Sequence, residues 1–173
     1  MKRVFLAAAD TISAGLGFVA KAMVLILIAS MLYEVVARYA LGAPTLWAFD
    51  IAYMATGVLF VLGAAQALRE DAHVRIDFLS SRLPMRLRGL IDGLLYLLVL
   101  CPVFGKLAWV AGHRAWRAFQ TGEVEAVSPW APLMWPFYSA IMIGLAALAL
   151  QLAAEGIRAL ASPRQDDTFK LEN

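Results

Sequence analysis

The fold of this chain is decided by residues 60–84, FVLGAAQALREDAHVRIDFLSSRLP, where an uncharged apolar run changes abruptly into a dense charged segment. The apolar run ends at Arg69, and Pro84 closes the charged segment. The charged and titratable side chains of the segment are Arg69, Glu70, Asp71, His73, Arg75, Asp77 and Arg82. So sharp a change is typical of a chain that passes from lipid into water. Arg69 therefore marks a predicted membrane exit, from which the other segments can be oriented.

The composition of the chain places it among integral membrane proteins. Its 173 residues are 62% hydrophobic and 16% charged, and the mean hydropathy is +0.72. Soluble domains are near half apolar and a quarter charged, so this chain has too few charges to cover a surface that faces water. The net charge of +2 is spread along the chain without the clustering that a nucleic-acid surface needs. The single cysteine, Cys101, excludes a disulfide framework within the chain.

Apolar stretches of membrane-spanning length predict an all-α membrane protein with four transmembrane helices in a single domain, residues 1–173. The expected helices cover about residues 15–41, 47–68, 87–116 and 137–160. Residues 69–86 are expected to lie at the cytoplasmic surface and to include a short amphipathic helix. Residues 117–136, with three prolines and two tryptophans, are expected to form a periplasmic loop, and residues 161–173 a polar tail. Gly89 and Gly93 have the spacing that lets a second helix approach closely.

The distribution of lysine and arginine predicts that both termini are cytoplasmic. Ten basic residues belong to the two ends and the second connection: Lys2, Arg3, Arg69, Arg75, Arg82, Arg86, Arg88, Arg158, Arg164 and Lys170. The opposite side has three: Arg38, Arg114 and Arg117. Loops rich in lysine and arginine remain in the cytoplasm. We interpret the N-terminus as a mature cytoplasmic end and not a signal peptide, because Asp10 and Lys21 interrupt its first apolar stretch.

Glu34, Arg38 and Lys106 are charged side chains within the predicted membrane helices. Glu34 and Lys106 are expected at similar depth, on helices that could touch, while Asp50 opens the second helix on the same side. One interpretation is structural: Glu34 pairs with Arg38 four residues later, with Lys106 or with a partner, and Lys106 otherwise extends toward the membrane surface. The other interpretation is an ion or proton site. We favour structural pairing, because a paired carboxylate stays ionised.

No motif in the sequence indicates an enzyme or a cofactor. We find no glycine-rich phosphate loop, no nucleophile elbow and no cluster with metal-ligand spacing. His73 and His113 are expected on opposite faces of the membrane, ~30 Å apart, so they cannot both bind one haem iron.

Residues 38–84 resemble the small membrane subunit of tripartite ATP-independent periplasmic (TRAP) transporters, the DctQ-like family. The resemblance is carried by Arg38-Tyr39, Trp47, Asp50, Gly63-Ala64-Ala65, Arg69 and His73-Val74-Arg75-Ile76-Asp77. In such transporters a large sodium-coupled permease moves as an elevator, and a periplasmic substrate-binding protein delivers an organic acid. The resemblance implies a non-transporting scaffold subunit without a cofactor in the bacterial inner membrane, in contact with both proteins and with phospholipids.

For the individual residues, the resemblance and the predicted topology together indicate two interfaces. Trp47 and Asp50 are expected at a periplasmic-side interface. The residues expected at a cytoplasmic interface or at lipid headgroups are Arg69, His73, Arg75, Asp77 and Arg82.

Two alternative functions remain open from the residues alone. A small four-helix proton-coupled exporter would also carry a carboxylate in its first helix, although Arg38, one turn after Glu34, argues against it. The second alternative is a haem-carrying membrane anchor of a redox enzyme.

Overall fold

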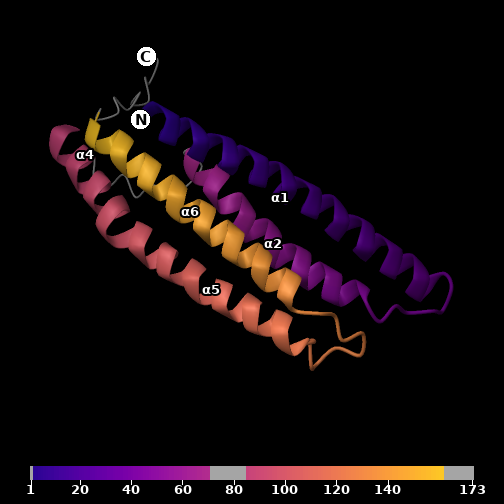
Figure 1. The fold of residues 1–173 in the computed structure, drawn as a ribbon. Coiled ribbons are helices and arrows are strands. Elements are labelled where there is room, and N and C mark those ends of the chain that lie inside the picture. The colour runs from indigo at the N-terminus through magenta and orange to yellow at the C-terminus, as the bar shows by residue number, and fades with distance from the viewer. Residues whose placement is uncertain (1, 71–84, 162–173) are drawn as a thin grey trace, which may run out of the picture.

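The structure, a computed structural model, describes residues 2–70 and 85–161, and these form an antiparallel helical bundle (Figure 1). Its elements are α1 (Lys2–Tyr39), α2 (Ala48–Arg69), α4 (Met85–Leu94), the π-helical segment η1 (Leu95–Leu100), α5 (Cys101–Thr121) and α6 (Trp135–Ala161). Four continuous helical stretches are long and apolar enough to cross a membrane: Arg3–Tyr39, Ala48–Arg69, Gly89–Thr121 and Trp135–Ala161. The predicted all-α fold with four membrane helices is confirmed for these residues.

The helices lie side by side in the order α1, α2, α6, α5, so that α1 and α5 form opposite edges of the bundle (Figure 1). α2 packs on α1, and α6 packs on α2, on α5 and also on α1. One end of the bundle, here called the terminal end, holds the start of α1 and the end of α6. The opposite end, called the loop end, holds the connections formed by residues 40–47 and 122–134.

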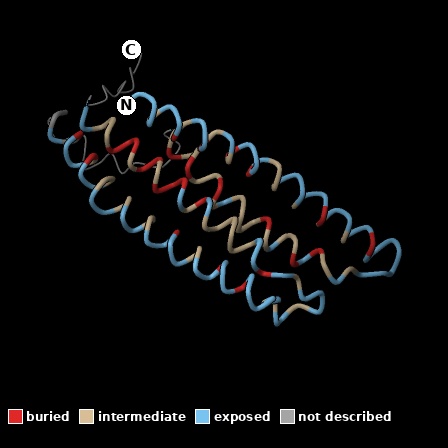
Figure 2. Tube along the Cα trace, in the orientation of Figure 1, coloured by how far each residue is buried: buried red, intermediate tan, exposed pale blue. Residues whose placement is uncertain are grey.

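The two central helices supply most of the buried surface (Figure 2). A core cluster joins Ala65 and Leu68 of α2 to three residues of α6, Ala147, Leu148 and Leu152. Large apolar side chains remain exposed along the outer faces, including Phe18 and Leu25 on α1 and Leu98, Trp109 and Trp116 on η1 and α5. In a bilayer these apolar faces can contact the lipid chains, so the outer helices need few contacts within the bundle.

Glycines set the closest approaches between helices. A Cβ atom built at Gly144 of α6 would lie 2.6 Å from Val61 Cγ1 and 2.9 Å from the Val61 carbonyl carbon. At the terminal end Gly93 of α4 faces Gly156 of α6, and a Cβ at Gly93 would lie 3.2 Å from the Gly156 carbonyl oxygen. Gly93 of the predicted Gly89–Gly93 pair thus lies where α4 meets α6. Small residues at such crossings let two backbones touch in a membrane.

Prolines and glycines mark the ends and the irregular turns of the helices. Pro102, which lacks an amide donor, lies two residues after the end of η1, and the helix widens into π geometry just before it. Gly122 ends α5 with φ 62°, a left-handed conformation that suits glycine. Pro136 stands in the first turn of α6, where a missing amide hydrogen has no cost.

Several expected boundaries differ from the structure. α1 begins at Lys2 and not near residue 15, because Asp10 does not end the helix but pairs with a side chain of α6. α5 continues to Thr121, beyond the expected end at residue 116, until Gly122 stops it. The predicted amphipathic helix within residues 69–86 and the polar tail 161–173 fall almost entirely in residues 71–84 and 162–173, outside the described parts of the chain.

Candidate functional sites at the two ends of the bundle

Glu34 is the centre of a hydrogen-bonded cluster at the loop end. Arg38 donates from Nε to Glu34 Oε1 over 2.8 Å, and its guanidinium also forms an ion pair with that oxygen. The other carboxylate oxygen, Oε2, accepts from the Thr45 amide over 2.9 Å and from the Thr45 hydroxyl. Only 12% of the Glu34 side chain is exposed, against 53% for Arg38. Glu34 therefore joins the last turn of α1 to the connection that leads into α2.

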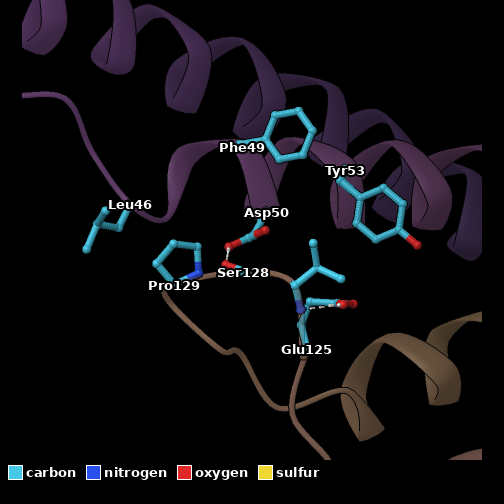
Figure 3. A pocket seen from close by; sticks show the side chains of 8 residues that line it. Leu46, Phe49, Asp50, Tyr53, Glu125, Ser128 and Pro129 are labelled. Atoms are coloured by element: carbon cyan, nitrogen blue, oxygen red, sulfur yellow. Dashed lines mark hydrogen bonds between the residues drawn. The ribbon is translucent and has the colours of Figure 1, made fainter.

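Trp47 and Asp50 lie beside this cluster but serve different contacts. The Trp47 ring stacks on Tyr33 of α1, with 5.5 Å between ring centroids. Asp50 is buried in the first turn of α2 and accepts a hydrogen bond from the Ser128 hydroxyl (Figure 3). Ser128 belongs to the 122–134 connection, so Asp50 attaches that connection to α2. Both residues expected at a periplasmic interface thus lie at the loop end.

An open hollow of about 350 Å³ lies next to Asp50 (Figure 3). Phe49 and Tyr53 of α2 form one wall, and Val127 and Pro129 of the connection form the other. The Glu125 carboxylate borders it and accepts weakly from the Val127 amide at 3.4 Å. The lining of the hollow thus combines the carboxylates of Asp50 and Glu125 with the exposed apolar side chains of Phe49 (77%) and Val127 (91%).

The 122–134 connection is itself held in a defined conformation. Val124 and Leu133 form an isolated antiparallel bridge, and the Met134 amide donates to the Glu123 carbonyl over 2.9 Å. Arg114 of α5 pairs with the Glu123 carboxylate at 2.5 Å and lies over the Tyr138 ring of α6, 5.3 Å from its centroid. These contacts connect α5 and α6 at the loop end.

A second polar cluster, which the sequence did not predict, lies at the terminal end between α1 and α6. Arg158 pairs with Asp10 at 2.5 Å and with Glu155. Gln151, which is fully buried, donates to Asp10 Oδ1 over 3.3 Å and to Glu155 Oε1 over 3.1 Å. The Ser13 hydroxyl donates to Gln151 Oε1 over 2.8 Å. We call these five residues the terminal-end cluster.

The residues expected at a cytoplasmic or lipid-headgroup interface are only partly described. Arg69 at the end of α2 lies 3.9 Å from Asp10, measured from Nε to Oδ1, so it borders the terminal-end cluster. The remaining four, His73, Arg75, Asp77 and Arg82, fall outside the described residues.

Lys106 lies apart from Glu34, although the sequence placed them at similar depth. α2 and α6 separate α5 from α1, so the two side chains occupy opposite edges of the bundle (Figure 1). Lys106 is exposed on α5, and no ion pair within the described residues includes it. His113, two turns further along α5, packs edge-on against Trp109 with 4.6 Å between centroids. Among the described residues, no group of three or more His, Cys, Asp or Glu is placed to hold a metal ion.

The arrangement defines a class of protein before any comparison: a multi-pass membrane bundle whose clustered carboxylates at both ends are engaged by cations, amides and hydroxyls. Residues 27–162 match the family described as "Tripartite ATP-independent periplasmic transporters, DctQ component", and the chain belongs to this family. The resemblance predicted from residues 38–84 is thereby confirmed, and the chain is a membrane component of a transporter, not an enzyme. Neither the curated proteins nor the solved structures gave a match.

Proposed function

We propose that this chain is the non-transporting scaffold subunit of its TRAP transporter. In this proposal it pairs with a large sodium-coupled elevator permease and a periplasmic substrate-binding protein, which together import an organic acid. It spans the bacterial inner membrane with both termini, and hence the terminal end, in the cytoplasm. The loop end then faces the periplasm.

The main support for the scaffold role is that carboxylates of the membrane helices are bound by other side chains of the chain. Glu34 is held by Arg38 and Thr45, and Asp10 by Arg158. A carboxylate that carries Na⁺ or H⁺ through a membrane has to exchange its partner during each cycle. Carboxylates with fixed internal partners instead hold helices together, which is the requirement of a static part.

The outer faces of the bundle favour a role that depends on a partner. In an apolar 18-residue segment of the stretch Gly89–Thr121, 6% of the residues are buried within the chain. The corresponding share for α6 is 39%. A helix with so little internal packing has a wide face available to lipid and to a second membrane protein. The large permease subunit is the partner that the family supplies.

The two ends of the bundle fit the two sides of the proposed assembly. The hollow beside Asp50, with Trp47 nearby, would meet the periplasmic binding protein. Arg69, His73, Arg75, Asp77 and Arg82 would meet phospholipid headgroups or the cytoplasmic side of the permease. Basic side chains at a cytoplasmic membrane surface are attracted by anionic lipids.

Reconstituted transport tests this function. Vesicles that contain the large permease and this chain, supplied with the binding protein and a sodium gradient, should accumulate the organic acid. Vesicles with only one of the two membrane subunits should not. Undiminished uptake without this chain would contradict the scaffold role, and proton-coupled transport by this chain alone, abolished by Glu34→Gln, would favour the exporter.

A further inference from the structure

A stripe of side chains runs along the outer face of α5 and contains a lone cation. Its members recur at helical spacing on the side of α5 that the bundle leaves uncovered: Val103, Lys106, Trp109, His113 and Trp116. Trp109 is 63% exposed and Trp116 61% exposed. Within the described residues no hydrogen bond or ion pair reaches Lys106. We call these five residues the α5 stripe.

Lys106 lies deep within the hydrocarbon region. It follows Gly93 by thirteen residues, ~20 Å at 1.5 Å per residue, and Gly93 contacts α6 beside the terminal-end cluster. It precedes His113 by seven residues, or ~10 Å. With a hydrocarbon core of ~30 Å between the two polar levels, the loop end is the nearer boundary.

The usual direction of a helical side chain works against contact between Lys106 and that nearer boundary. Side chains of an α-helix lean toward the N-terminus of the helix, and for Lys106 this is the direction of the terminal end. The ammonium group therefore leans away from the closer surface and toward the more distant one. A lysine in a membrane helix reaches water most easily when its side chain leans toward the nearer membrane surface.

Lys21 of α1 provides the comparison within the same chain. It is also exposed, and no ion pair within the described residues includes it. It follows Asp10 by eleven residues, ~16 Å, and precedes Glu34 by thirteen residues, ~20 Å. Its lean toward the N-terminus points to the terminal end, which is the nearer boundary in this case. Lys21 therefore leans toward its nearer boundary, whereas Lys106 leans away from its own and needs a negative charge at its own depth.

We propose that the α5 stripe docks a membrane helix of a different protein, and that this helix presents an aspartate or glutamate to Lys106 within the hydrocarbon region. The inference rests on the proposed function, because it assigns the stripe to the large permease subunit. Trp109 and Trp116 lie on the loop-end side of the lysine and supply the large apolar contacts typical of interface centres. A membrane-embedded ion pair of this kind compensates a cation that lipid alone would leave unpaired.

Two other occupants offer Lys106 no suitable negative charge. A lipid phosphate lies at the headgroup level, beyond the reach of Lys106. In a second copy of this chain the carboxylate nearest that depth, Glu34, is already bound by Arg38 and Thr45. Charge complementarity therefore selects a foreign membrane helix.

Co-purification with the large permease subunit tests the docking. The tagged chain is co-expressed with the permease, and the permease recovered per tagged chain is measured after mild solubilisation. Lys106→Glu should lower the recovery about tenfold or more, and Lys106→Met about threefold, where tenfold corresponds to ~1.4 kcal/mol. The matched variants Lys21→Glu and Lys21→Met should stay within about twofold of the unmodified chain. Equal yields of the tagged chain establish that each variant inserts and folds.

Charge exchange and cross-linking give a second readout. A photoreactive phenylalanine analogue at Trp109 should cross-link to the permease, and the same analogue at Phe18 of α1 should not. An acidic-to-lysine substitution in the cross-linked permease helix should restore the recovery lost with Lys106→Glu.

The outcomes separate this inference from the proposed function. If the unmodified chain recovers the permease and Lys106→Glu recovers it equally well, the docking of the α5 stripe is refuted and the scaffold role stands. Cross-links from Trp109 only to lipid or to a second copy would refute it as well. If the unmodified chain recovers no permease, the scaffold role fails and the inference fails with it.

Discussion

Replacing Gly144 by alanine tests how α2 and α6 are joined at the centre of the bundle. The added Cβ would lie 2.6 Å from Val61 Cγ1 and 2.9 Å from both the carbonyl carbon and oxygen of Val61. The Val61 side chain can rotate away, but the backbone atoms move only if the two helices separate. Overpacking of this kind costs about 1–3 kcal/mol. Alanine also gains ~1 kcal/mol over glycine in a helix, so we expect a net loss of up to ~2 kcal/mol.

The matched control is Gly105→Ala on α5. A Cβ built at Gly105 meets no atom within 4 Å, so only the helix-propensity gain of up to ~1 kcal/mol remains. Unfolding by increasing mole fractions of dodecyl sulfate in mixed micelles, followed by far-ultraviolet circular dichroism, should shift the midpoint down for Gly144→Ala and up for Gly105→Ala. The same shift in both variants, or a more stable Gly144→Ala, would refute the contact between the two backbones.

Three further substitutions examine the polar clusters. Asp10→Asn removes the charge that faces Arg158. Because the pair is partly exposed, we expect the free energy of unfolding to fall by about 1 kcal/mol in the same titration. An unchanged midpoint would mean that the pair does not stabilise the bundle. Ser128→Ala leaves the buried Asp50 without its hydroxyl donor, which should cost ~1–2 kcal/mol, while Ser128→Thr should retain the unmodified midpoint. Glu34→Gln should speed amide hydrogen exchange in the turn between α1 and α2, and unchanged exchange would show that another contact holds that turn.

The parts of the fold that the sequence predicted correctly depend on local pattern. Apolar stretches of sufficient length identified four membrane helices, because lipid requires each span to be apolar over its own length. The Glu34–Arg38 contact is one of the three pairings that the sequence left open for Glu34, and it has the spacing of four residues on one helix. The family was recognisable from the short segment between Arg38 and Pro84.

The parts that could not be predicted depend on partners distant in sequence. The first helix was expected to begin near residue 15, because Asp10 interrupts the apolar stretch before it and its partner Arg158 lies almost at the opposite end of the chain. Gln151 and Glu155, four residues apart in an apolar helix, were the one signal of the terminal-end cluster, since such residues in lipid need polar partners. Likewise, helix depth alone placed Glu34 near Lys106, and only the order of the helices in space separates them.

The length of α1 has a consequence for the surrounding bilayer. Its 38 residues extend over ~57 Å, almost twice the thickness of the hydrocarbon core. A helix of this length either inclines strongly or carries a turn or more into the aqueous phase. Because α2 lies along α1 and α6 along α2, an inclination of α1 is shared by its neighbours. In the inclined arrangement, acyl chain length would set the inclination of the whole subunit, with longer acyl chains holding it more upright.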